Sequence, residues 1–215
     1  MQTRSTRLDY DGTYQQALNS ADPLTWIENK WGKAEPYVRQ FLKPYLCQDM
    51  NILEIGAGLG RYTQWLLPYC SALFLVEPSQ LCRQFLMKHF ETARVLQPMD
   101  ITSQVEPNSL HLVCSFSTML HFNLYEIWWY FRIIDEKLSM GAKVIIHYAS
   151  LEEGGWEVFA KAKCFNFGDV GRYSFHHASQ LRKLGQILGW DMVSDQGPRQ
   201  SIVPGHRVIT FERGK

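Results

Sequence analysis

The sequence predicts an α/β fold in which helices cover both faces of a mostly parallel sheet. Short apolar runs alternate along the chain with segments whose apolar residues recur at helical spacing, which is typical of strands linked by crossover helices. One of these runs passes directly into three glycines at alternate positions, which indicates a strand-to-helix turn. With 215 residues, 46% hydrophobic and 13% aromatic, the chain can build one domain with a substantial core but not a second full domain.

Residues 1–50 are predicted to form a helical N-terminal cap, because the stretch from Trp26 to Leu46 combines helical spacing with proline interruptions. Residues 51–215 form the predicted main domain. Within it, residues 151–175 are the longest irregular stretch, and they follow the carboxyl end of a predicted strand, where open α/β sheets bind ligands. We therefore expect a loop or lid insertion at about 151–175.

The main domain is predicted to alternate strands with helices. The strands are expected at Asn51–Ile55, Ala72–Val76, Arg94–Gln97, Leu110–Phe116, Ala142–Tyr148, Trp190–Ser194 and Arg207–Phe211. The helices are expected at Gly60–Leu67, Ser79–Phe90, Leu124–Leu138 and Ala178–Gly189, the last with Ser174 or Ser179 near its N-terminal cap. No helix separates the last two strands, so they should form a hairpin.

The glycine turn reads I-L-E-I-G-A-G-L-G-R-Y-T over residues 52–63. Glycines let a backbone turn tightly and approach a ligand without a Cβ in the way, and the following helix offers unpaired N–H groups. The dinucleotide fingerprint requires its third glycine at position 61, where this chain has Arg61. The run from Glu54 to Gly60 instead resembles motif I of the class I S-adenosylmethionine (SAM) dependent methyltransferases, in which the loop packs against the methionine half of SAM.

Glu77 lies at the end of the second predicted strand, at the distance from the glycines where such a fold needs it. A carboxylate there can accept hydrogen bonds from both ribose hydroxyls of an adenosine. NAD enzymes also use an acidic residue at this position, so Glu77 supports a nucleoside ligand without choosing between the two families. The alternative is a solvated carboxylate at a strand end.

The resemblance continues through later segments. Asp100 stands where the family often places an acidic contact to the adenine amino group, although Asp is also a preferred cap for the short turn that follows. The tip of the fourth strand, S-F-S-T from Ser115, resembles motif IV, and L-S-M-G-A-K-V-I-I-H resembles the turn before the fifth strand. No D-P-P-Y or N-P-P-Y run is present, which disfavours methylation of base amines in DNA.

The resemblance covers about Asn51 to Glu212. It implies a three-layer, Rossmann-like sheet of seven strands, mostly parallel, with an antiparallel last strand and a helical N-terminal cap. It also implies SAM as cofactor, S-adenosylhomocysteine (SAH) as its product, and a set of cofactor-binding residues. These are Glu54, Gly56, Ala57, Gly58, Gly60, Glu77, Pro78, Asp100, Ile101, Ser115 and Phe116.

Two histidines are candidates for a catalytic base. His121 lies just beyond the fourth strand and His147 near the end of the fifth, and an imidazole there can take the proton of an attacking hydroxyl. A structural role is the alternative for each. Aromatic and imidazole side chains of the cap and the long loop are candidates for binding the acceptor substrate. These are Trp31, Tyr37, Trp156, Tyr173 and His176.

The function that the resemblance implies is transfer of a methyl group from SAM to an oxygen or nitrogen of a small molecule, of the kind found in natural-product pathways. Three alternatives stay open: a peptide or protein methyltransferase, a non-catalytic SAM-binding partner module, and an NAD(P)-dependent oxidoreductase. The glycine spacing and the lack of a Tyr-x-x-x-Lys pair count against the last of these.

Composition limits the partners and the compartment. The formal charge is +1 without a dense basic block, so we expect no nucleic-acid partner. The five cysteines form no C-x-x-C pair, which suits a reducing cytosol and argues against a zinc site; the sequence supports no metal ligands. The N-terminus lacks the apolar core of a signal peptide, and no apolar run approaches the roughly 18 residues of a membrane span. We expect a cytoplasmic monomer or homodimer that does not bind membranes.

Overall fold

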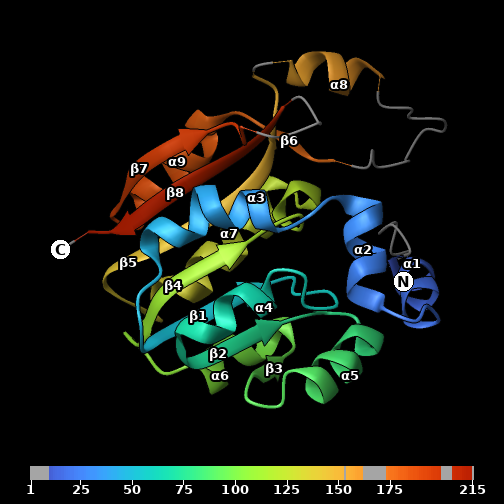
Figure 1. Ribbon diagram of the computed structural model, residues 1–215. Helices are drawn as coiled ribbons and strands as arrows, with labels where there is room; N and C mark the ends of the chain where they lie inside the picture. The colour runs from blue at the N-terminus through green and yellow to red at the C-terminus, as the bar shows by residue number, and fades with distance from the viewer. Residues whose placement is uncertain (1–9, 153, 162–172, 200–204, 215) are drawn as a thin grey trace, which may run out of the picture.

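The computed structural model describes residues 10–152, 154–161, 173–199 and 205–214, and its centre is one mixed sheet (Figure 1). The strands lie in the order β3-β2-β1-β4-β5-β8-β7. The strands from β1 to β5 pair in parallel, and β8 is antiparallel to both β5 and β7. Their bounds are β1 Met50–Ile55, β2 Cys70–Val76, β3 Arg94–Leu96, β4 Leu110–Ser115, β5 Leu138–Ser150, β7 Trp190–Gln196 and β8 His206–Arg213. The predicted α/β class and the closing hairpin are confirmed.

The strand residues alternate between two hydrophobic clusters, one on each face of the sheet. In β2, for example, Phe74 and Val76 join one cluster, whereas Leu73 and Leu75 join the other. Successive side chains of a strand point to opposite faces, so a strand buried on both sides reads as a continuous apolar run. This explains why the strands carry so few polar residues.

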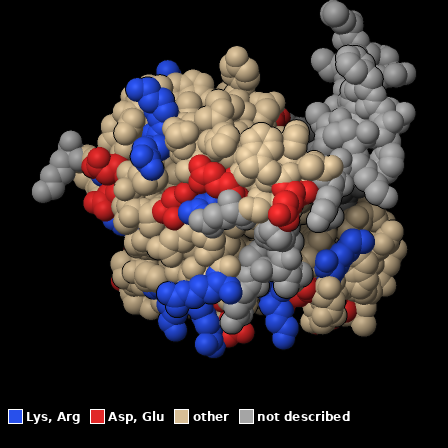
Figure 2. Space-filling model, turned by 90° about the horizontal axis from the view of Figure 1, so that it is seen from above, with Lys and Arg blue, Asp and Glu red and all other residues tan. Residues whose placement is uncertain are grey.

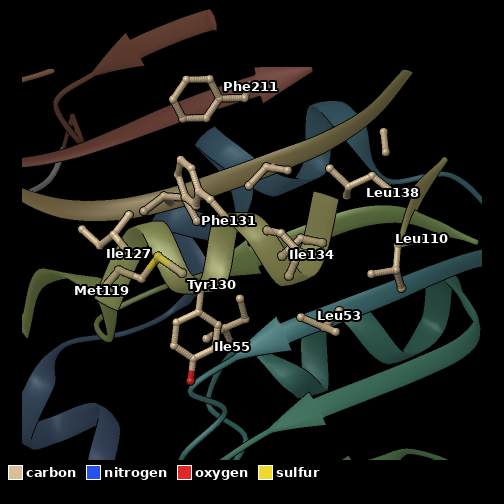
Figure 3. Packing of buried hydrophobic residues seen from close by; sticks show 14 of the residues in the cluster. Leu53, Ile55, Leu110, Met119, Ile127, Tyr130, Phe131, Ile134, Leu138 and Phe211 are labelled. Carbon is tan, nitrogen blue, oxygen red and sulfur yellow. The ribbon is translucent and has the colours of Figure 1, made fainter. Parts of the chain in front are cut away.

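The first face is covered by α6 (Ile101–Gln104), α7 (Leu124–Asp135) and α9 (Ala178–Ile187). Figure 3 shows Phe131 and Ile134 of α7 pointing into this core, with Phe211 of β8 and Leu53 of β1 on either side. The second face is covered by α2 (Pro23–Trp31), α4 (Thr63–Leu66), α5 (Gln80–His89) and the turns near Val38–Leu42. The result is the three-layer arrangement that was predicted.

The N-terminal segment is helical over most of its described length. After α1 (Tyr10–Leu18) and α2, α3 (Glu35–Tyr37) continues into a π-helical turn at Val38–Leu42 and a 3-10 turn at Lys43–Tyr45. Single π-turns are frequent at functional sites. In Figure 1, α1 and α2 lie on the side toward which β2 and β4 point, so this segment borders the carboxyl edge of the parallel strands.

Three predicted helix boundaries were wrong. Gly60 has φ +88, which a right-handed helix excludes, so α4 begins at Thr63 and not at residue 60. The helix α7 ends at Asp135 because Leu138 already pairs with Leu110 in the sheet. The N-cap of α9 is His177, with neither Ser174 nor Ser179 in that role.

The segment 151–175 contains more regular structure than predicted. Residues 155–161 form α8 (Gly155–Lys161), and β6 (Phe175–His176) pairs in parallel with the end of β5. That pairing exists because β5 runs past the neighbouring strands, to Ser150. Residues 153 and 162–172 of this predicted lid, Cys164 among them, lie outside the described residues.

Two further observations concern the surface. Basic and acidic side chains are interspersed with wide uncharged areas on the face seen in Figure 2, as the near-zero net charge suggests. In the parts of the chain that the structure describes, no helix combines the length and the apolar character needed to cross a membrane.

Candidate active site at the carboxyl edge of the sheet

The glycine loop adopts a backbone that only glycines accept readily. Gly56, Gly58 and Gly60 have φ of +78, +57 and +88. The amides of Gly56 and Ala57 both donate to the carbonyl of Val76, at 2.7 and 3.3 Å, which ties the loop to the end of β2. A Cβ on Gly56 would lie 2.1 Å from Thr118 Oγ1, and one on Gly60 would lie 2.3 Å from the Phe90 ring. The loop is therefore packed between the tip of β4 and the helix α5.

The Glu77 carboxylate joins the glycine loop to the start of α5. Its Oε2 accepts from the Gly58 amide at 2.9 Å, and its Oε1 accepts from the Ser79 amide at 2.8 Å. Burial raises the pKa of the Glu77 carboxyl, while these two backbone bonds oppose the rise. A carboxylate oxygen has two lone pairs, so each oxygen can still accept a bond from a ligand hydroxyl.

Glu54 lies beneath the loop and is buried. Its Oε2 accepts from the Thr63 hydroxyl at 2.6 Å, which connects β1 to the first residue of α4. Burial raises the pKa of Glu54 to about 8, with a further contribution from Glu77. At neutral pH this carboxyl is therefore largely protonated.

Asp100 and Ile101 lie at the start of α6. Asp100 Oδ2 accepts from the Gln97 amide at 2.9 Å. Asp100 therefore has the capping role that the sequence analysis gave as the alternative to adenine binding. Its contact to an adenine stays a prediction. Ile101 is fully buried in the core. Nearby, a groove of about 390 Å³ is lined by Pro78, Pro98 and residues at the start of α7, among them Tyr125, Trp129 and Tyr130.

The tip of β4 is held in a strained conformation. Ser115 Oγ donates to the carbonyl of Ile55 at 3.1 Å, which joins the ends of β4 and β1. Ser117 has φ +58, a left-handed value that non-glycine residues rarely adopt. Its amide donates to His147 Nδ1 at 3.1 Å, and its hydroxyl accepts from Arg61 Nη2 at 2.8 Å. Backbone strain of this kind persists where surrounding contacts enforce it, often at functional sites.

The two candidate base residues differ in their surroundings. His147 is 2% exposed, and burial lowers its pKa well below the ordinary value, with His206 adding to the effect. Because His147 Nδ1 accepts from an amide, its proton lies on Nε2, which is 3.1 Å from His206 Nδ1. His121 ends the 3-10 turn Met119–His121 and is half-buried, with its ring stacked on Tyr173 at 5.5 Å.

The predicted acceptor-binding residues divide into two groups. The Tyr37 ring packs against Phe116 and His147 at 6.1 and 5.3 Å, and Tyr173 lies against His121, so both border the β4 tip. Trp31 contributes its carbonyl, which accepts from Arg61.

Trp156 and His176 have other surroundings. Trp156 is 57% exposed on α8 and packs against Phe159 and His177. His176 is buried in β6, and its Nε2 is 2.8 Å from the carbonyl of Phe122, to which it donates. Burial lowers the pKa of His176.

Several residues at this edge were not selected from the sequence. The Arg61 guanidinium joins the glycine loop to α2 and β4, although the sequence indicated only that position 61 is not glycine. Tyr14 of α1 lies over the loop, with its hydroxyl 3.0 Å from where a Cβ on Gly58 would be. His206 of β8 pairs with His147. Only contacts between distant parts of the chain reveal these roles.

No metal centre is indicated in the ranges that the structure describes, where no group of three or more His, Cys, Asp or Glu side chains could hold an ion. Four cysteines of the described residues are free thiols.

Replacing Gly56 with alanine should destabilise the fold far more than the same change at Gly141. Both glycines have similar φ, +78 and +75, but a Cβ on Gly141 meets nothing within 4 Å. Gly141→Ala should cost about 1 to 2 kcal/mol from backbone strain alone, and Gly56→Ala about 2 to 5 kcal/mol once the clash with Thr118 is added. Urea unfolding measures both, and equal losses would show that the approach of Thr118 is not a constraint.

Glu54 should make the protein less stable as pH rises from 6.5 to 8. The folded state holds the Glu54 proton up to about pH 8, whereas the unfolded chain releases it near 4.5, so the folded state binds more protons in between. The free energy of unfolding should fall by at most about 1.4 kcal/mol per pH unit from this group. His147 acts in the opposite direction, because its pKa in the folded state lies well below 6.5, and this opposing contribution fades as the pH rises above 6.5.

The Glu54→Gln variant should lose this part of the pH dependence, and the exposed Glu91→Gln variant should keep it. Urea unfolding of the three proteins between pH 6.5 and 8 is the measurement. An unchanged slope in Glu54→Gln would mean that the buried carboxyl is ionised throughout.

No protein-family model and no curated protein matches the sequence. Solved structures do resemble the chain. Magnesium protoporphyrin IX methyltransferase from Synechocystis PCC 6803, solved with bound SAH, matches with a TM-score of 0.67 and 11% identity over 95% of this chain and 94% of that one.

Two further structures match at a similar level. An S-adenosylmethionine-dependent methyltransferase from Clostridium acetobutylicum ATCC 824 has a TM-score of 0.65 and 12% identity over 96% of this chain and 98% of that one. The complex of DhpI with SAH has a TM-score of 0.65 and 14% identity over 95% of this chain and 93% of that one. At these identities the similarity concerns the fold, and the protein has the fold of the class I SAM-dependent methyltransferases.

Proposed function

We propose that the protein is a SAM-dependent methyltransferase that acts on a small-molecule acceptor. One observation carries the proposal: the glycine loop and the tip of β4 meet where the order of the sheet reverses. The chain runs outward from β1 to β3 and then returns to β4 on the other side of β1. Open α/β sheets bind ligands at this switch point, outside the carboxyl ends of the strands.

The residues at the switch point fit the donor. The glycine loop and the Glu77 carboxylate lie side by side, joined by the bond from the Gly58 amide, and the carboxylate retains lone pairs for ribose hydroxyls. SAM, when bound, supplies an electrophilic methyl group on its sulfonium sulfur. The protein's contribution is to align this group with the acceptor and to exclude water. Tyr14 and α1 support the second task, because they lie over the glycine loop.

The acceptor side is lined by rings. Phe116 stacks on Tyr62 at 4.8 Å and lies against Tyr37 and His147, which makes an enclosed aromatic wall at the β4 tip. The helical N-terminal segment contributes Tyr37 to this wall and so packs over the β4 tip. Such a site suits a free metabolite better than a folded protein or a polymer.

The geometry favours different roles for the two histidines. His147 holds the Ser117 amide with one nitrogen and faces His206 with the other, so it acts as a positioning residue for the strained tip. His121, half-buried beside the tip, is the better candidate to take the proton from a hydroxyl acceptor. A neutral amine acceptor needs such a base much less.

Binding of SAH tests the donor site. Calorimetry should show binding to the wild type and about 10- to 100-fold weaker binding to Glu77→Ala, because two charge-assisted hydrogen bonds to the ribose are lost. The exposed Glu106→Ala variant serves as the control and should bind as the wild type does. A wild type that binds neither SAM nor SAH refutes the proposal, and a response to NADH in its place would favour an oxidoreductase.

Histidine variants test the catalytic base once an acceptor is found by screening small molecules for SAH production. With a hydroxyl acceptor, His121→Ala should lower kcat by about 10²- to 10⁴-fold and remove the loss of activity at acid pH. His147→Ala should lower kcat while keeping that acid limb, since it acts through Ser117. An intact acid limb in His121→Ala would exclude His121 as the base. A protein that binds SAH but methylates nothing in a broad screen would favour a non-catalytic SAM-binding module.

A further inference from the structure

Two histidines of neighbouring antiparallel strands meet on one face of the sheet. In the register of β5 and β8, Val208 lies opposite His147 and His206 lies opposite Ala149. The two imidazoles are therefore diagonal neighbours on the same face, where long side chains reach each other. His147 Nε2 lies 3.1 Å from His206 Nδ1. Figure 1 shows the two strands side by side.

The Ser117 amide sets the direction of hydrogen bonding through both rings. It donates to His147 Nδ1 at 3.1 Å, so the proton of His147 lies on Nε2. That proton points at His206 Nδ1, which must therefore be the acceptor. A neutral imidazole that accepts on Nδ1 carries its own proton on Nε2. One chain of hydrogen bonds thus runs from the tip of β4 through His147 to His206.

This chain has no place for an additional proton. A proton on His206 Nδ1 would face the proton on His147 Nε2, and a proton on His147 Nδ1 would face the Ser117 amide. Each of these changes breaks one of the two bonds. The chain therefore holds only while both rings are neutral.

The surroundings of His147 favour its neutral form. The side chain is buried, and burial lowers the pKa of His147 well below the ordinary value, with further contributions from His206, Arg61 and His121. Arg61 acts from the turn after the glycine loop, and His121 acts from the 3-10 turn beyond β4. The Tyr37 ring packs against His147 from α3. The fixed charge of Arg61 opposes a second positive charge on His147.

The conformation of Ser117 depends on this chain. Its φ of +58 is rarely adopted by residues other than glycine, so contacts must hold it. Without His206, the buried Nε2–H of His147 would lose its acceptor, and an unsatisfied buried donor is costly. If the ring turned to recover a partner, it would release the Ser117 amide. His206 therefore acts on the tip of β4 at one remove.

We propose that His206 is a positioning residue of the site: it accepts from His147, fixes the tautomer and orientation of that ring, and so holds the tip of β4. The proposal rests on the proposed function, because the tip affects ligands only if they bind at this edge. His206 also packs edge-on against Tyr173 at 5.2 Å, and Tyr173 stacks on His121. One residue thus supports both the tip and the candidate base.

Nitrogen NMR of the histidine rings tests the chain in the wild type at neutral pH, because chemical shifts distinguish protonated from unprotonated ring nitrogens. Both His147 and His206 should be neutral, with the proton on Nε2 and an unprotonated Nδ1. A charged His206, or one with its proton on Nδ1, would overturn the proposal. This measurement needs neither a variant nor a ligand.

Variants test whether His206 holds the tip. His206→Leu removes the acceptor and should lower the hydrogen-exchange protection of the Ser117 amide by about 5- to 30-fold. His206→Asn should keep most of this protection, because its Oδ1 is placed as Nδ1 is and can accept. His111→Leu is the matched control, since the exposed His111 also accepts a backbone amide on Nδ1, that of Asn51 at 2.9 Å, at the other end of β4. It should leave Ser117 unchanged.

Wild-type protection of Ser117 in a folded His206→Leu, or equal losses in His206→Asn and His206→Leu, would also overturn the proposal. Thermal unfolding checks the fold of each variant, and the ring tautomers of the wild type decide the matter if His206→Leu does not fold. Calorimetry with SAH gives the functional consequence: affinity should fall in His206→Leu and recover in His206→Asn, and equal affinities would exclude a role of the tip in binding. If the wild type does not bind SAH, the proposed function fails, while the tautomers and the exchange of Ser117 still decide the role of His206.

Discussion

The close approach of the glycine loop to the tip of β4 is the constraint on which the rest of the site depends. Because Gly56 has no Cβ, Thr118 can pack against its backbone and donate to its carbonyl at 3.2 Å. The same approach brings Ser117 within reach of Arg61, and Arg61 in turn holds the end of α2. A side chain at position 56 would push these elements apart. The absence of a Cβ at Gly56 therefore allows the donor loop, the β4 tip and the N-terminal helices to be in contact.

Burial then decides which groups at this edge carry charge. Desolvation raises the pKa of Glu54 and Glu77 and lowers that of His147, so it favours the neutral form of each. Arginine resists this effect because its guanidinium remains protonated in proteins. Arg61 therefore keeps its charge beside the buried Glu54, whose neutral form is favoured.

Much of the fold could be predicted from local patterns. Apolar runs located all seven main strands, because a strand buried on both faces must be apolar along its length. The glycines and Glu77 were found because their roles require particular residue types at particular points of the chain. Predictions failed where a local signal was weak. The two-residue strand β6, at the end of a stretch predicted to be irregular, exists only through pairing with β5. The role of Trp156 in acceptor binding stays a prediction.

The sequence by itself determined the α/β class, the order of the strands along the chain and the position of the glycine loop, since each follows from periodicity or from the conformational freedom of glycine. Only the tertiary structure decided what Arg61, Ser117 and His147 do. Arg61 binds residues that lie 29 to 56 positions away in the sequence. Ser117 and His147 are 30 positions apart. Local spacing carries no information about contacts across such distances. They arise when parallel strands bring their carboxyl ends to one edge of the sheet.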